Sequence, residues 1–153
     1  MAFENAERYL NQKGFGDRII RFETSSATVD LAAAALGVDG ALIAKSLTFM
    51  TAEGPIMVLC AGDKRVSNPK FKEEFKCKAK MLTRDEVNLL VGHDVGGVCP
   101  FGINEGVRVF LDVSLKAFDT VYPACGDAAS AVKLKVDELE GLANSEKWVD
   151  VCQ

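Results

Sequence analysis

Two apolar runs, LIAKSLTFM at residues 42–50 and PIMVLCA at residues 55–61, decide the fold of this chain. Both are rich in β-branched and other apolar side chains, which favour extended strands. Ala52-Glu53-Gly54 between them is typical of a turn. The two runs therefore predict a β-hairpin.

Lys45 is the only charged residue of the first run. In an extended strand it shares a face with Ile43, Leu47 and Phe49. An ammonium among apolar neighbours is costly to remove from water unless its head reaches solvent or meets an anion. Two interpretations stay open: an edge-strand lysine whose head is solvated, or a cation placed to bind an anionic ligand.

Local signals around the hairpin predict a mixture of helices and strands. Caps, glycine stops and helical spacing predict helices over 4–13, 28–37, the segment after Asn68-Pro69, the segment after a Thr83–Glu86 capping box, and 137–142. Apolar runs predict strands over 18–22, 107–113, 120–122, 131–136 and 148–151. Because strands and helices do not alternate regularly, an α+β fold with a mostly antiparallel sheet is favoured. No repeat or linker interrupts residues 1–153, so one domain is expected.

Composition excludes several classes of protein. Hydrophobic content of 48% and charged content of 26% are ordinary for a soluble globular protein. No apolar run approaches the roughly 20 residues of a membrane helix, and residues 1–7 lack signal-peptide features, so no membrane contact and a cytoplasmic location are expected. The five cysteines form no C-x-x-C pair and His93 is the only histidine, so neither a metal nor another cofactor is expected.

Positive charge is concentrated in residues 64–80. Two acidic residues there oppose seven basic ones, giving +5: Lys64, Arg65, Lys70, Lys72, Lys76, Lys78 and Lys80. Since the whole chain has a net charge of −4, the remainder carries −9. This asymmetry could present a basic face to phosphates, or it could be a solvated helix surface.

The second segment that could form a functional site is GGVCPFG at residues 96–102. Successive amides in glycine-rich turns can bind an anion or a developing oxyanion, although many such segments are simple turns. Cys99 within it invites a nucleophile interpretation, but His93 is the only histidine base available and no third group is apparent. A small buried thiol is the favoured role for Cys99, and His93 is a weak site candidate.

In these features the chain resembles the YbaK family of aminoacyl-tRNA editing domains, which includes the insertion domain of bacterial prolyl-tRNA synthetase. The resemblance spans nearly the whole chain. It is carried, in order, by the helix over 28–37 and by residues 44–47, 62–64, 96–102, 109–112 and 121–126.

The resemblance implies a mixed, mostly antiparallel, partly barrel-like sheet flanked by helices, with a cleft for the tRNA 3′ end. It also implies hydrolysis of the ester that joins a wrong amino acid to tRNA, by water helped by a ribose hydroxyl of the substrate. Lys45 would orient the terminal adenosine and its ester, and the G-x-x-x-P backbone from Gly96 to Pro100 would bind the aminoacyl group. The expected catalytic residues are Lys45, Gly96 and Gly97.

Two further groups of residues are expected to contact the substrate. The aminoacyl end would be bound by Thr28, His93, Val98, Cys99, Pro100 and Phe101. The tRNA body would be bound by Lys64, Arg65, Lys70 and Lys72, and an aminoacyl-tRNA synthetase is a further candidate partner.

One departure leaves the edited amino acid open. Some family members that remove cysteine carry an acidic residue about where this chain has Ala131. Alanine, cysteine and serine, attached to tRNA-Pro, all stay candidates, since a small pocket separates them only modestly by size. The leading hypothesis is a stand-alone trans-editing deacylase. The alternatives are a non-catalytic module that binds tRNA or a synthetase, and a small acyl-ester hydrolase.

Overall fold

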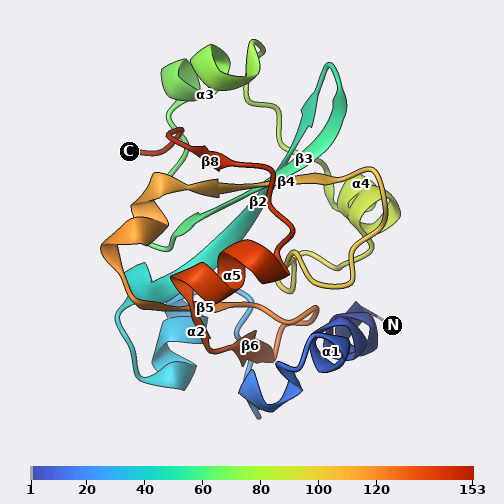
Figure 1. Ribbon diagram of the computed structural model, residues 1–153, viewed down its shortest axis with the longest axis vertical. Coiled ribbons are helices and arrows are strands. Elements are labelled where there is room, and N and C mark those ends of the chain that lie inside the picture. The colour runs from blue at the N-terminus through green and yellow to red at the C-terminus, as the bar shows by residue number, and fades with distance from the viewer. Residues whose placement is uncertain (1) are drawn as a thin grey trace.

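A computed structural model describes residues 2–153 of the protein. Six strands form a curled, open half-barrel in the order β7-β5-β2-β3-β4-β8 (Figure 1). Their bounds are β2 (Ile43–Thr51), β3 (Gly54–Ala61), β4 (Arg108–Asp112), β5 (Thr120–Pro123), β7 (Leu134–Lys135) and β8 (Trp148–Val149). A separate antiparallel pair joins β1 (Ile19–Arg21) to β6 (Ser130–Val132). The mixed α+β prediction is confirmed.

The predicted hairpin forms the centre of the sheet. β2 and β3 pair antiparallel from Ala44↔Ala61 to Thr51↔Gly54, the longest pairing in the molecule. Three other pairings, β2 with β5, β3 with β4 and β4 with β8, are parallel. These bring together segments that lie far apart in the chain, such as Ile43 with Tyr122 and Leu111 with Trp148, which no local pattern specifies.

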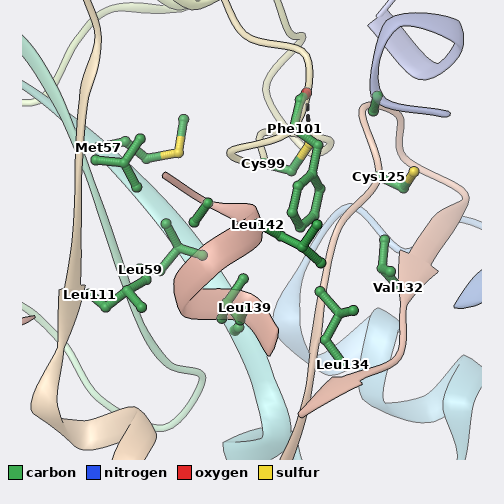
Figure 2. Close-up of a cluster of buried hydrophobic side chains, with 14 of the residues drawn as sticks. Met57, Leu59, Cys99, Phe101, Leu111, Cys125, Val132, Leu134, Leu139 and Leu142 are labelled. Carbon is green, nitrogen blue, oxygen red and sulfur yellow. Dashed lines mark hydrogen bonds between the residues drawn. The ribbon is translucent and has the colours of Figure 1, made fainter. Parts of the chain in front are cut away.

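The two faces of the hairpin bury different cores. Met57 and Leu59 of β3 point into a core with Leu139 and Leu142, which α5 (Val136–Leu142) contributes (Figure 2). Ile56, Val58 and Cys60 alternate with them and point to the opposite face. There they pack with Phe49 and with Phe71, which belongs to α3 (Asn68–Phe75).

Helix boundaries follow local capping chemistry. α1 (Ala2–Gln12) precedes the turn at Gly14, and α2 (Val29–Leu36) begins after Thr28, whose hydroxyl accepts a hydrogen bond from the Leu31 N–H. The predicted capping box at Thr83–Glu86 is present and begins α4 (Arg84–Glu86), which continues into a π-helical turn over 87–91. For α3, the Asn68-Pro69 pair predicts Asn68 as the cap and Pro69 as the first helical residue, which is wrong by one residue. Ser67 caps the helix because its hydroxyl accepts from the Lys70 N–H, which makes Asn68 the first helical residue.

The single strand predicted over 131–136 is also wrong in extent. Residues 130–132 pair with β1, whereas Leu134 and Lys135 pair with β5 in the main sheet. The break falls at Lys133, whose N–H donates to Arg18 O. One apolar run therefore serves two sheets. Within residues 2–153, no helix is both long enough and apolar enough to cross a membrane.

Candidate functional site

The site begins at a gap in the edge of β2. Pairing with β5 reaches only Ala44, and farther along the strand residues 80–82 take over the same edge. There Leu82 N–H donates to Thr48 O and Met50 N–H donates to Lys80 O. Main-chain groups of alternate residues in a strand point to the same side, so the N–H and C=O of Ser46 face this gap. The gap gives a ligand access to the strand backbone.

A cavity of about 300 Å³ opens at this gap. Its walls come from β2, from the segment that leads into α2, from the glycine-rich loop and from residues near β6. Most lining side chains are small or apolar, such as Ala27, Val29, Ala44, Val98 and Ala124. Met81 and Val95, both exposed, also border it and offer apolar surface to a flat ring.

Within residues 2–153, Lys45 is the only charged residue that lines this cavity. It lies half-buried on β2, opposite Cys60 in the hairpin register. Because β2 lies between β5 and β3, the interpretation of Lys45 as an edge-strand lysine is wrong. Among residues 2–153, no carboxylate forms an ion pair with its ammonium. A partly desolvated cation without a protein counter-ion is suited to an anionic ligand.

Gly96 lies on the same cavity as Lys45, as does Val98. The backbone of Gly96 has φ of +100°, a conformation that favours glycine. A Cβ added there would lie 3.1 Å from Ala27 Cβ, so the loop backbone approaches the segment before α2 closely. Thr28, another predicted substrate contact, lines the cavity from that segment.

Gly97 does not line the cavity, although it was expected to be catalytic with Gly96. Its N–H donates to Asp94 O and its C=O accepts from Gly126 N–H, both at 3.0 Å. A Cβ at this position would overlap the backbone of Asp127. Since its amide is already bonded, Gly97 positions the loop rather than offering an oxyanion donor.

The second half of the loop turns into the core. Cys99 and Phe101 are fully buried beside Cys125 and Leu142 (Figure 2), and neither lines the cavity. Pro100 is buried too and borders a separate hollow with Tyr9. As aminoacyl contacts, these three predicted residues are not supported, because they are buried and do not line the cavity.

His93 is placed with this buried half. Its Nε2 lies 2.8 Å from Phe101 O and 3.4 Å from Cys99 Sγ, while its Nδ1 is buried without a partner. Burial lowers the pKa of His93 and raises the pKa of the Cys99 thiol well above its usual range. The burial of Cys99 confirms the predicted buried thiol, and its raised pKa disfavours an activated nucleophile.

The basic residues divide by location. Lys64 and Arg65 border a hollow that also includes Lys45, so their charges adjoin the cavity. Lys70 is engaged elsewhere, because its ammonium donates to Asp150 Oδ1 and to Cys152 O. Lys72 is exposed on α3.

Two cavity residues were missed from the sequence. Ser26 and Ser46 line the cavity, and each has a buried hydroxyl oxygen without a hydrogen-bond partner. Ser46 adjoins Lys45 and could have been found from that, whereas Ser26 lies in a segment with no distinguishing pattern. No group of three His, Cys, Asp or Glu side chains is arranged to hold a metal ion within residues 2–153.

Comparison with known proteins agrees with this geometry. The family model described as "Aminoacyl-tRNA editing domain" matches residues 23–142. YwhH of Bacillus subtilis, an uncharacterized protein, is 44% identical over 155 residues, covering 100% of this chain and 98% of that protein. The proline–tRNA ligase of Streptococcus sanguinis is 31% identical over 86 residues, which cover 56% of this chain and 14% of the ligase.

A solved structure has nearly the same fold. The crystal structure of "a putative trans-editing enzyme for prolyl tRNA synthetase" superimposes with a TM-score of 0.90 at 27% identity, covering 99% of this chain and 97% of that one. The family match covers most of the chain and includes Thr28, Lys45, Gly96 and Val98. The chain therefore belongs to the aminoacyl-tRNA editing domain family.

Proposed function

We propose that this protein is a trans-editing deacylase that hydrolyses the ester of tRNA mischarged with a small amino acid, with tRNA-Pro as the candidate tRNA. The observation that carries the proposal is the convergence of Lys45 and Gly96 on one cavity. The ammonium of Lys45 can bind a phosphate, and the backbone of the turn at Gly96 can bind the aminoacyl ester beside it, in a largely apolar cavity.

The cavity lining constrains the mechanism. It includes no Asp, Glu, His or Cys, so it offers neither a general base nor an activated thiol. Water is therefore the nucleophile: its oxygen bonds to the acyl carbon and the ester bond to the ribose oxygen breaks. The neighbouring ribose hydroxyl of the substrate relays a proton from the water to the leaving oxygen. The products are the free amino acid and uncharged tRNA.

Protein groups act by placement and electrostatics. Lys45 holds the anionic 3′ end, so the ester lies beside the loop. The N–H groups of Gly96 and Val98 have no partner in the hydrogen bonds described for residues 2–153, and they supply donors for the oxyanion. Such donors stabilise the transition state more than the ground state, which raises the rate.

The charge of residues 64–80 supports a polyanionic substrate. This segment leaves β3 near Lys45, forms α3 over one face of the hairpin, and returns to the β2 edge at Lys80. Lys45 points to that same face, because it lies directly opposite Cys60, whose side chain packs there with Phe71 of α3. Lys64, Arg65 and Lys72 are exposed there to meet tRNA phosphates, while Lys70 would first have to leave Asp150.

Similarity to named proteins also favours this proposal. One structural relative is described as "a putative trans-editing enzyme for prolyl tRNA synthetase", and curated relatives include proline–tRNA ligases. A cytoplasmic location and contact with a synthetase follow as further expectations of the proposal.

The direct test is a deacylation panel. Purified protein is incubated with tRNA-Pro carrying alanine, serine or cysteine, and ester loss is measured against buffer and a Lys45→Ala variant. We expect hydrolysis of at least one member, strongly reduced by the substitution. If no member is cleaved faster than by the variant, the proposal fails.

A non-catalytic tRNA-binding module is the second candidate, and the same basic segment favours it. It predicts tRNA binding that weakens steeply with salt and survives Lys45→Ala, without ester cleavage. A small acyl-ester hydrolase instead predicts turnover of aminoacyl-adenosine without the tRNA body. Charge reversal at Lys64 and Arg65 separates it from the leading proposal, because only a tRNA substrate loses affinity.

A further inference from the structure

We propose that the hydroxyls of Ser26 and Ser46 select an acyl group that itself carries a hydroxyl, such as a seryl or threonyl group. This inference rests on the proposed function and narrows its substrate class. It starts from two serines on the same cavity whose oxygens have no hydrogen-bond partner.

The two serines approach the cavity from different elements. Ser26 follows β1 and is held by its main chain, since its N–H donates to Ala128 O at 2.6 Å. Only 7% of its surface is exposed. Ser46 lies on β2 beside Lys45, at the gap in the strand edge. Both side chains are therefore held on rigid backbone, as a binding contact requires.

Two other hydroxyls of the cavity wall already have partners. Thr28 Oγ1 accepts a hydrogen bond from Leu31 N–H and Ser130 Oγ donates to Asp127 Oδ1 at 2.7 Å. Ser26 and Ser46 differ from these two, because their oxygens are buried without a partner. A buried hydroxyl without a partner destabilises a protein, so such groups call for an explanation such as a ligand that completes them.

The chemistry of the acyl group follows from what the hydroxyls can do. Each can donate one hydrogen bond and accept others, so together they suit a group that also donates and accepts. The hydroxyl of a seryl group meets this need, whereas the methyl group of an alanyl group leaves both serines unpaired. Among the described residues that line the cavity, only Lys45 is charged, which disfavours a cationic side chain.

The competing role for these serines is contact with a part common to every aminoacyl-tRNA, namely the α-amino group or the ribose. The two roles differ in their dependence on the acyl side chain. Selection changes the ratio of rates for two amino acids, whereas a common contact changes both rates together.

The experiment compares Ser-tRNA-Pro with Ala-tRNA-Pro, which differ by one oxygen atom. We expect wild-type kcat/KM to favour the seryl substrate by at least about tenfold, the scale of one buried hydrogen bond. In the Ser26→Ala/Ser46→Ala double variant the ratio should fall to about threefold or less. Ser145→Ala, at a half-buried serine outside the cavity, is the matched control and should keep the wild-type ratio.

Equal wild-type rates, or a preference that survives the double substitution, would overturn the proposal. So would an equal loss for both substrates, because that identifies a common contact. A second readout does not depend on catalysis: calorimetric binding of amide-linked seryl-adenosine and alanyl-adenosine, which cannot be hydrolysed. If wild type cleaves neither ester, the deacylase proposal fails, and the binding of these analogues then tests selection on its own. Tighter binding of the seryl analogue that is lost in the double variant supports selection, whereas equal affinities, or a preference that survives the double substitution, contradict it.

Discussion

The two halves of the glycine-rich loop differ sharply in what they touch. Val95, Gly96 and Val98 line the cavity that contains Lys45. Cys99 and Phe101, only a few residues later, are fully buried in the core beneath α5 (Figure 2). One short motif therefore supplies a binding surface with its first half and an anchor with its second.

This difference shows how a flexible type of sequence is held rigid. Gly97 joins the halves and is fixed by hydrogen bonds to Asp94 and Gly126. The ring of Phe101 stacks against Tyr9 at 6.3 Å between centroids. Because the anchor is buried, the backbone that faces the cavity is preorganised, which is what oxyanion stabilisation demands.

Replacing the cavity cation should give the largest effect on chemistry. We expect Lys45→Ala to lower kcat/KM for deacylation by about 100-fold or more, the scale of losing one preorganised electrostatic contact. Unfolding in urea should be little changed, since Lys45 makes no ion pair among residues 2–153. Lys133→Ala, which alters an exposed lysine outside the cavity, is the matched control. If Lys45→Ala retains full activity, the cavity that the first half of the loop lines is not the catalytic site.

Truncating the anchor should instead act on stability. Phe101→Ala removes a fully buried ring and should lower the free energy of unfolding by about 3–5 kcal/mol. Chemical denaturation followed by tryptophan fluorescence measures this, because Trp148 packs against the same core. Phe101→Leu, which preserves more of the apolar volume, should lose less. Equal losses for the two variants would show that the ring does not anchor the loop.

A smaller effect is expected at the thiol of the anchor half. Cys99→Ala should lower the free energy of unfolding by about 1–2 kcal/mol, because it leaves a small cavity. Its deacylation rate should stay within about twofold of wild type, far from the loss expected at an oxyanion donor. Cys125→Ala, at the neighbouring core thiol, is the control for lost volume. A rate loss at Cys99 comparable to that of Lys45→Ala would return Cys99 to the site.

Sequence reasoning succeeded where the signal is local. The central hairpin and the Thr83–Glu86 capping box depend on residues within a few positions of one another, and both are present. The sequence offers Ser25, Ser26 and Thr28 as caps of the second helix, and Thr28 is the residue that caps it. Lys45 and Gly96 were selected because a cation among apolar strand residues and successive amides of a glycine-rich turn can each bind an anion. Their combination into one site was suggested by this shared chemistry and by the family resemblance.

Sequence reasoning failed where distant contacts decide. Which loop residues face the cavity depends on how Gly97 packs against Asp127, a contact that no pattern within 96–102 contains. The split of residues 131–136 between two sheets depends on Arg18, more than a hundred residues away. The unpaired hydroxyl of Ser26 becomes visible only when every neighbour is placed.

The buried half of the loop should also make stability depend on pH, because it packs against His93. Burial lowers the pKa of His93 in the folded protein, whereas the unfolded chain titrates near about 6.5. Below that pH the unfolded state binds the extra proton first, so the free energy of unfolding should fall as pH decreases from about 7.5 to about 5.5. The physical cause is Nδ1, which would become a buried donor without a partner.

His93→Gln provides the matched variant, because its amide can still donate to Phe101 O but does not titrate. His93 is the only histidine, so this substitution should flatten the stability profile measured by urea denaturation across that pH range. A wild-type profile as flat as that of the variant would contradict the burial of a neutral imidazole beneath the loop. Among the described residues that line the cavity there is no histidine, so deacylation by the folded protein should show no step that follows the titration of His93.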